Sequence, residues 1–270
     1  MSEPAAKQLR HAYGFDDVAI VPGALTTNPD LVEATFSLGE RDFGLPIIAA
    51  AMDAVVNPKF ATIFSKLGGL AVLNLDGVQT RYEDPESVLE EIATATDEES
   101  TTLLQRVYER PVKDQLIGER IEEIKSSGGV AIVSATPQST KRVVPLAVEA
   151  GVDYFVVQST VTTARHLSRS LYGLRLDELV EQISPVPVLV GNTVDTGAAL
   201  ELMETGIHGV LVGVGPGSAC TSREVLGIGI PQVTATVDTA YARDIYYERS
   251  GRYVPIITDG GIRTGGDLAK

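Results

Sequence analysis

The single cysteine of the chain, Cys220, is the first residue whose surroundings suggest chemistry. It lies in the stretch GVGPGSACTSREVLGIG, which follows an apolar run and is dense in glycine. Gly213, Gly215 and Gly217 loosen this segment and let a backbone approach a ligand closely. A lone cysteine is commonly a small buried apolar residue, but this setting favours a reactive thiol. We therefore expect Cys220 to act as a nucleophile.

Hydroxyl side chains flank the cysteine on both sides. Ser218 precedes it, and Thr221 and Ser222 follow it. Hydroxyls at such positions can bind a phosphate or hold an activated water. For Thr221 the ordinary polarity of a loop is an equally good explanation.

A second motif, TDGGIRTGGD at 258–267, combines a carboxylate with glycines. Asp259 suits the hydroxyls of a ribose, and the N–H groups of Gly260 and Gly261 suit a phosphate. An ordinary turn between a strand and a helix is the alternative, because Asp-Gly pairs are common in turns. Neither motif is the GxGxxG or P-loop pattern of nucleotide-binding folds.

Seven short apolar runs must position these motifs, and most are followed by a helix-like segment. They are residues 45–53, 69–75, 130–136, 154–160, 187–193, 209–215 and 254–260. Continuous apolar runs are typical of parallel strands that are covered on both faces. Residues 139–151 and 195–206 read as amphipathic helices, the latter with Asp195 near its start and Gly206 at its end.

Repeated strand and helix units predict an α/β fold, either a doubly wound sheet or a (β/α)8 TIM barrel. Polar or glycine-rich residues end almost every apolar run, and this favours the barrel, whose active site collects side chains from many strands. These residues are Met52, Asp53, Asn74, Gln158, Asn192, the Cys220 loop, Asp259 and Gly260. The sequence ends shortly after the seventh run, so we expect a single barrel domain over residues 1–270, truncated after strand seven.

Residues 76–128 interrupt this alternation of apolar runs and helix-like segments, because they are strongly acidic at first and then mixed in charge and helical. A solvated helical excursion is the favoured interpretation. An insertion that packs on a partner subunit is the alternative.

Composition restricts the partners. The net charge of −14 argues against nucleic acid and acidic membranes, whereas small phosphorylated ligands can be held by backbone N–H groups. One cysteine and three histidines leave little for a zinc site, so any metal is expected to have oxygen ligands. The chain shows no membrane-spanning run and no signal peptide, and we expect a cytoplasmic protein.

Four segments together resemble the IMP dehydrogenase and GMP reductase family. GVGPGSACTSREVLGIGIPQ is similar to its active-site loop, AAAMDAV to its first-strand motif, VGNTVDT to its GGN strand, and PIITDGGIRTGGDLAK to its ribose-binding and phosphate-binding segment. The order and spacing agree from about residue 13 to residue 270. The segment 76–128 is too short for the CBS domains of most IMP dehydrogenases, so the chain resembles a bacterial subfamily that lacks them.

The resemblance implies a mechanism. The Cys220 thiolate attacks C2 of IMP, hydride passes to NAD, and hydrolysis of the thioimidate gives XMP for guanine nucleotide synthesis. Ser222 stands where the family has a threonine that handles water. Carbonyls of Gly215, Gly217 and Cys220 match those that hold a monovalent cation, usually K+. The implied substrate-binding residues are Met52, Asn192, Ser218, Asp259, Gly260 and Gly261, and the implied cofactor-binding residues are Gln158 and Gly213. The family also implies a homotetramer, sometimes paired into an octamer.

The chain departs from the family pattern at two positions. Gln158 stands where an aspartate near the cofactor ribose is usual, which leaves open whether the cofactor is NAD or NADP, and Ala50 replaces a serine. The alternatives are a GMP reductase, which converts GMP to IMP and ammonia with NADPH, and a purine-nucleotide-binding relative without catalysis. Because the flap that separates the two reactions would follow residue 270, we expect little activity from these 270 residues alone.

Overall fold

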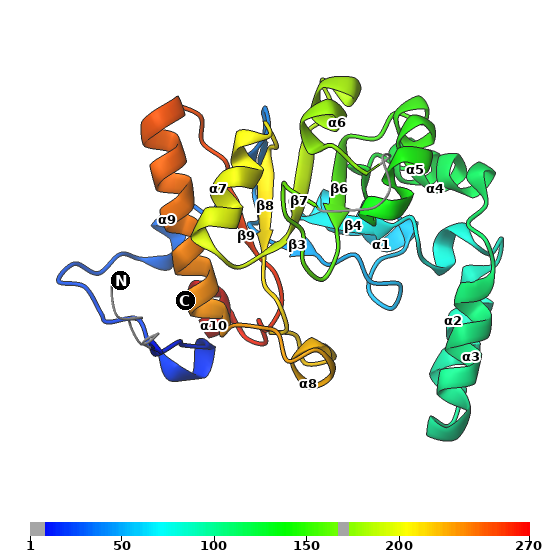
Figure 1. Cartoon of the computed structure of the whole chain (residues 1–270), viewed down its shortest axis with the longest axis horizontal. Helices are drawn as coiled ribbons and strands as arrows, with labels where there is room; N and C mark the ends of the chain where they lie inside the picture. Colours follow the sequence, from blue (N-terminus) through cyan, green and yellow to red (C-terminus); the bar gives the residue numbers. More distant parts are fainter. Residues whose placement is uncertain (1–8, 167–172) are drawn as a thin grey trace, which may run out of the picture.

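Seven parallel strands form a curled, open sheet in the computed structural model of the chain, which describes residues 9–166 and 173–270 (Figure 1). In spatial order they are β3 (Ile48–Ala49), β4 (Leu70–Asn74), β5 (Ile132–Ala135), β6 (Tyr154–Gln158), β7 (Val188–Thr193), β8 (Gly209–Val212) and β9 (Ile256–Thr258). Each strand pairs in parallel with the next one along the chain. β3 and β9 are the edges and are half-buried, whereas the strands between them are buried. All seven predicted strands are confirmed.

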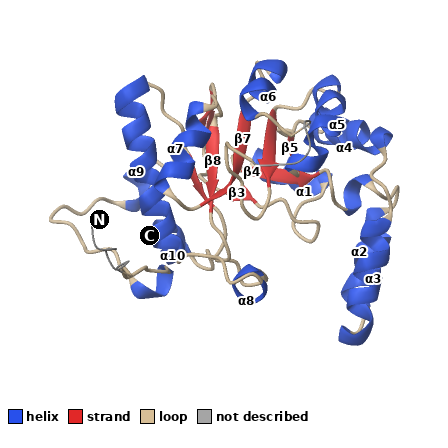
Figure 2. Cartoon of the chain, in the orientation of Figure 1, coloured by secondary structure: helices blue, strands red, loops and turns tan. Residues whose placement is uncertain are grey.

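Helices connect these strands and cover the outer face of the sheet (Figure 2). They are α1 (Pro58–Lys66), α4 (Asp114–Ser126), α5 (Pro137–Glu149), α6 (Leu176–Ile183), α7 (Thr196–Glu204) and α9 (Gln232–Ser250), and α10 (Gly265–Ala269) follows the last strand. The predicted cap of α7 is present, since the Asp195 carboxylate accepts the N–H groups of Gly197 and Ala198. Parallel strands in sequential order with helices on one face are the architecture of a TIM barrel without its eighth unit, as predicted.

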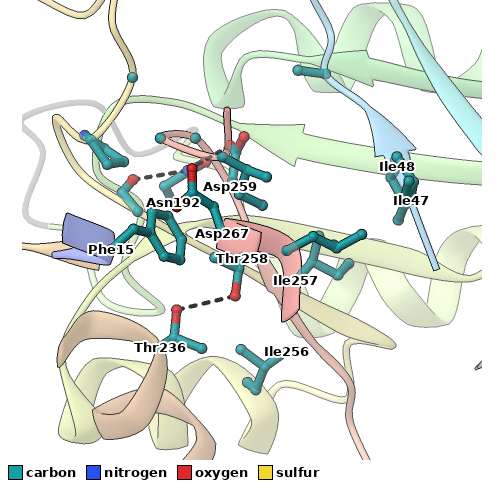
Figure 3. A pocket seen from close by; sticks show the side chains of 18 of the residues that line it. Phe15, Ile47, Ile48, Asn192, Thr236, Ile256, Ile257, Thr258, Asp259 and Asp267 are labelled. Carbon is teal, nitrogen blue, oxygen red and sulfur yellow. Dashed lines mark hydrogen bonds between the residues drawn. The ribbon is translucent and has the colours of Figure 1, made fainter. Parts of the chain in front are cut away.

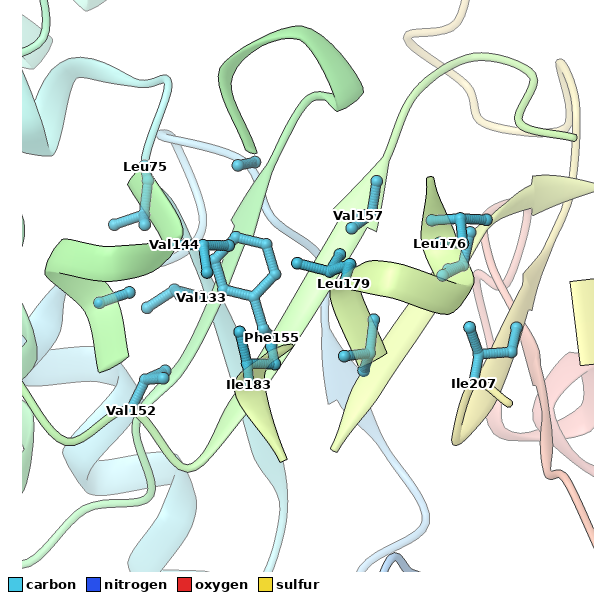
Figure 4. Packing of buried hydrophobic residues seen from close by; sticks show 14 of the residues in the cluster. Leu75, Val133, Val144, Val152, Phe155, Val157, Leu176, Leu179, Ile183 and Ile207 are labelled. Carbon is cyan, nitrogen blue, oxygen red and sulfur yellow. The ribbon is translucent and has the colours of Figure 1, made fainter. Parts of the chain in front are cut away.

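The continuous apolar runs are explained by two separate apolar layers on either side of each strand. In β6, Tyr154 and Val156 face the interior of the curled sheet, whereas Phe155 and Val157 face the helices. The side chains of a strand alternate between its faces, so both faces must be apolar. Figure 4 shows Phe155 and Val157 packed with Val133, Val144 and Leu179 beneath the helices.

A short hairpin that the sequence did not predict covers the end of the sheet at which the strands begin. It pairs β1 (Phe36–Leu38) with β2 (Arg41–Phe43), and Leu38 and Phe43 join the interior apolar layer. The Tyr154 hydroxyl donates a hydrogen bond to the Leu38 carbonyl at 2.8 Å. Burial raises the pKa of Tyr154 to about 12, so this hydroxyl stays a donor at neutral pH. The hairpin therefore closes this end, and the open end lies opposite.

Residues 76–128 divide into two parts with different surroundings. α2 (Pro85–Thr94) and α3 (Asp97–Glu109) form a hairpin that projects away from the sheet in Figure 1. α4 instead buries Ile117, Ile121 and Ile124 in the layer between helices and sheet. The projecting hairpin thus contains the acidic stretch and the beginning of the stretch of mixed charge, and the rest of the latter supplies a helix of the barrel wall. Of the described helices, none has the length and apolar character that crossing a membrane requires.

Candidate active site

An open cavity of about 1480 Å³ lies at the end of the sheet where the strands terminate and extends along the edge between β3 and β9. Every residue to which the family resemblance gives a catalytic, substrate-binding, cofactor-binding or cation-binding role lines it, although these residues come from five different strand ends. They are Met52, Gln158, Asn192, Gly213, Gly215, Gly217, Ser218, Cys220, Ser222, Asp259, Gly260 and Gly261. Asp53, Asn74 and Thr221, which the sequence also suggested, are not among the lining residues. Parallel strands bring their carboxyl ends to one edge, and this geometry gathers the residues.

Cys220 is exposed to the cavity at the tip of its loop, just before the short helix α8 (Ser222–Val225). Its Sγ lies 3.4 Å from the Ser222 hydroxyl oxygen. Hydrogen bonding from the Ser222 hydroxyl, and then from the backbone of Ser222 and Gly215, lowers the pKa of the Cys220 thiol below its usual value. The thiolate is the nucleophilic form of cysteine, so these contacts favour reactivity. The backbone N–H of Cys220 donates to the Gly217 carbonyl at 3.1 Å and closes the turn.

The glycine turn after β9 packs directly against the cysteine loop. Gly260 and Gly261 have φ angles of +91° and +79°, which L side chains rarely adopt. A Cβ added to Gly260 would lie 3.0 Å from the Pro216 side chain, and one on Gly261 would lie 3.1 Å from the Pro216 carbonyl oxygen. The two glycines therefore allow the predicted phosphate-binding turn and the Cys220 loop to share one cavity.

Gln158, Asn192 and Asp259, from the ends of β6, β7 and β9, are hydrogen-bonded to one another. The Gln158 amide nitrogen lies 3.0 Å from Asn192 Oδ1 and 2.9 Å from Asp259 Oδ2. The Asn192 amide nitrogen lies 2.8 Å from the same Asp259 oxygen and 2.9 Å from the Gly213 carbonyl. Figure 3 shows Asn192 and Asp259 side by side at the cavity. The sequence placed these residues at strand ends, but it gave no sign of their mutual contacts.

Two residues outside the sequence motifs, Phe15 and Tyr108, also lie at or near the site. Phe15, from the N-terminal segment, lines the cavity beside Gly261. Tyr108 of α3 donates a hydrogen bond from its hydroxyl to Asp53, at 2.5 Å, next to the cavity residue Met52. Burial, followed by the Asp53 carboxylate, raises the pKa of Tyr108. The projecting hairpin is thus tied to the first strand end of the site.

The donors available around the cavity restrict the kind of metal that it could bind. Within residues 9–166 and 173–270, no group of three or more His, Cys, Asp or Glu side chains could hold a metal ion. Carbonyl and hydroxyl oxygens dominate the Cys220 loop, and oxygen donors suit hard cations.

Comparison with known proteins gives a consistent result. The sequence model of the IMP dehydrogenase / GMP reductase domain matches residues 12–270. A protein from Mycolicibacterium smegmatis described as an uncharacterized oxidoreductase is 37% identical over 268 residues, which are 97% of this chain and 71% of the relative. An inosine-5'-monophosphate dehydrogenase from Cryptosporidium parvum is 30% identical, over 98% of this chain and 65% of its own length.

The fold leads to the same group of proteins. The solved structure of an IMP dehydrogenase/GMP reductase-like protein from Corynebacterium glutamicum superposes with a TM-score of 0.90 at 31% identity, covering 99% of this chain and 71% of that one. Sequence and fold both match this family over nearly the whole chain. The chain belongs to the IMP dehydrogenase / GMP reductase family.

Proposed function

We propose that the protein oxidises IMP to XMP with NAD through a covalent intermediate on Cys220. One observation carries the proposal: an exposed thiol of lowered pKa shares a cavity with a strand-end carboxylate and a glycine turn. The carboxylate suits a ribose and the turn suits a phosphate, so a nucleotide bound by both would reach toward the thiol. The relative from Cryptosporidium parvum, named an IMP dehydrogenase, supports the choice of nucleotide.

The reaction divides into two steps that the residues around Cys220 support. The Cys220 sulfur forms a bond to C2 of the purine, and the C2 hydrogen leaves with its electron pair as hydride. NAD, when bound, supplies the acceptor for that hydride. Water then attacks C2, the carbon–sulfur bond breaks, and XMP leaves with release of one proton. Ser222, whose oxygen is 3.4 Å from the sulfur, stabilises the thiolate that leaves and positions the water.

The remaining cavity residues take complementary roles in this proposal. Ser218 with Gly260 and Gly261 binds the 5′-phosphate, Asp259 binds the ribose, and Met52 lies under the base. Carbonyls of Gly215, Gly217 and Cys220 would hold a K+ ion, which fits a loop that offers backbone oxygens and no cluster of carboxylates. The bound cation would stiffen the loop that carries the thiol. Assembly into a homotetramer, as the family implies, belongs to the same proposal.

Turnover in two substrate mixtures tests the direction of the reaction. Full-length protein is mixed with IMP and NAD, and separately with GMP and NADPH, while absorbance of the reduced nicotinamide is followed. Appearance of that band in the first mixture is the expected result. The family model covers both activities, so GMP reduction is the second candidate, and loss of the band only in the second mixture would establish it instead.

Mass spectrometry tests the covalent step separately. Incubation with IMP and NAD should leave a nucleotide adduct on Cys220, and Cys220→Ala should abolish it. An intact protein that binds IMP without forming the adduct would be a nucleotide-binding relative that lacks this chemistry.

A further inference from the structure

The amide of Gln158 has both of its N–H groups committed inside the site. One donates to Asn192 Oδ1 and the other to Asp259 Oδ2, at 3.0 and 2.9 Å. A carboxylate oxygen and an amide oxygen can only accept hydrogen bonds, so the orientation of the Gln158 amide is fixed by its two partners. The side chain therefore has no N–H left with which to grip a cofactor.

Asn192 is committed in the same way. It is 7% exposed, and its amide nitrogen donates to the Gly213 carbonyl and to Asp259 Oδ2, at 2.9 and 2.8 Å. Asp259 Oδ2 thus accepts two amide N–H groups from two different strands, which leaves Oδ1 of the same carboxylate for a ligand. Two charge-assisted hydrogen bonds on one oxygen hold the carboxylate in one rotamer.

We infer that Gln158 is a positioning residue for the nucleotide, and that its two N–H groups act through Asp259 and Asn192. The inference rests on the proposed function and assigns Gln158 to the nucleotide half of the site. In this chain a glutamate with the shape of Gln158 would bring a carboxylate oxygen to about 3 Å from Asp259 Oδ2 and repel it, whereas the neutral amide donates. Binding of the nucleotide, and not of NAD, should therefore depend on the Gln158 amide.

Gln158→Glu tests this with a pH dependence that a merely structural role would not produce. The substitution keeps the shape of the side chain and replaces its donor with a second carboxyl group. Two adjacent carboxyls cannot both ionise easily, so the pair retains one proton up to a raised pH. The pair holds more protons at pH 5.5 than at pH 8.5, so the introduced carboxyl is more often a donor to Asp259 at the lower pH and more often a repelling charge at the higher pH.

The measurement is the dissociation constant of IMP from calorimetry, expressed as the ratio of variant to wild type at each pH. We expect a ratio of about 10–100 at pH 8.5, falling several-fold at pH 5.5. Titration of IMP and of the other charged or titratable groups around the cavity changes the dissociation constant of variant and wild type alike, so its effect cancels in the ratio. These groups are Cys220, Tyr253, Arg263, Asp267 and Lys270.

Three controls accompany the variant. Gln158→Met removes the donor without adding a charge, so it should weaken IMP binding equally at both pH values. Gln105→Glu makes the same chemical change on the exposed surface of α3 and should leave the ratio near one. NAD binding is measured in the Cys220→Ala background saturated with IMP, where no turnover occurs.

The possible results distinguish failure of the positioning role of Gln158 from failure of the proposed function. A pH-dependent loss of IMP affinity with NAD affinity unchanged supports the positioning role. An unchanged IMP ratio, or a loss confined to NAD, would overturn it while the proposed function stood. If the wild-type protein itself does not bind IMP, the proposed function fails and the inference fails with it.

Discussion

Substitution of Gly213 by alanine should destabilise the protein strongly, because the added methyl group meets backbone. Gly213 is buried after β8 with a φ of +149°, a conformation that alanine rarely adopts. The new Cβ would lie 2.2 Å from the Asp259 carbonyl oxygen, far inside an ordinary contact of about 3.5 Å. Such backbone strain costs about 1–3 kcal/mol, and overpacking costs about 1–3 kcal/mol.

The unfolded state offsets part of this loss. Alanine restricts the unfolded chain more than glycine does, which stabilises the protein by about 0.4–1 kcal/mol. The net loss in free energy of unfolding is then about 1–5.6 kcal/mol. A central value of about 3 kcal/mol lowers Tm by roughly 6–12 °C. The Gly213 carbonyl also accepts the hydrogen bond from Asn192, so IMP affinity should fall as well.

Thermal and urea unfolding, followed by circular dichroism, measure this effect. Gly118→Ala is the matched control, because Gly118 lies inside α4 with no atom within 4 Å of its added Cβ. That change should raise the free energy of unfolding by about 0.5–1 kcal/mol. If Gly213→Ala unfolds within 1–2 °C of the wild type, the close approach of the β8 and β9 ends does not exist as described.

Ser222→Ala should raise the pKa of Cys220, because it removes the hydroxyl that most lowers it. Less thiolate is then present at neutral pH, so alkylation by iodoacetamide should slow and its pH midpoint should move upward; an unmoved midpoint would contradict the assigned contact. Tyr154→Phe should destabilise the protein by about 1–3 kcal/mol in urea unfolding, because the Leu38 carbonyl loses its buried donor. Ile121→Ala should cost about 2–5 kcal/mol if α4 is part of the barrel wall, and a loss below about 1 kcal/mol would argue for a peripheral helix.

The sequence predicted the strands well because their signal is local. Every run of the interior sheet has two apolar faces, and that requirement is written into consecutive residues such as Val156 and Val157. The hairpin β1–β2 carries no such signal. Its two strands are three residues each, and only Leu38 and Phe43 are buried, so their role depends on the Tyr154 side chain far along the chain.

Residues 76–128 also show that local sequence does not predict contacts between distant segments. Acidic composition marks α2 and α3 as a solvated excursion, but α4 has a mixed charge that gives no direct sign of its place. Its burial depends on the partners that α1 and α5 provide, and these are contacts between segments distant in sequence. Composition alone therefore could not separate the projecting hairpin from the barrel wall.

The order of the apolar runs along the chain predicts which residues gather at the site, because parallel strands bring their carboxyl ends to one edge. Cys220 and Asp259 could be placed there from the apolar runs before them. How the polar groups of the site share their hydrogen bonds depends on the three-dimensional arrangement of the strands. Gln158 of β6 joins Asn192 of the neighbouring strand β7 and Asp259, which follows β9 three strands away, and its donors are directed by the register and curl of the sheet. Hydrogen-bond direction varies over fractions of an ångström, a scale that residue types and spacing do not encode.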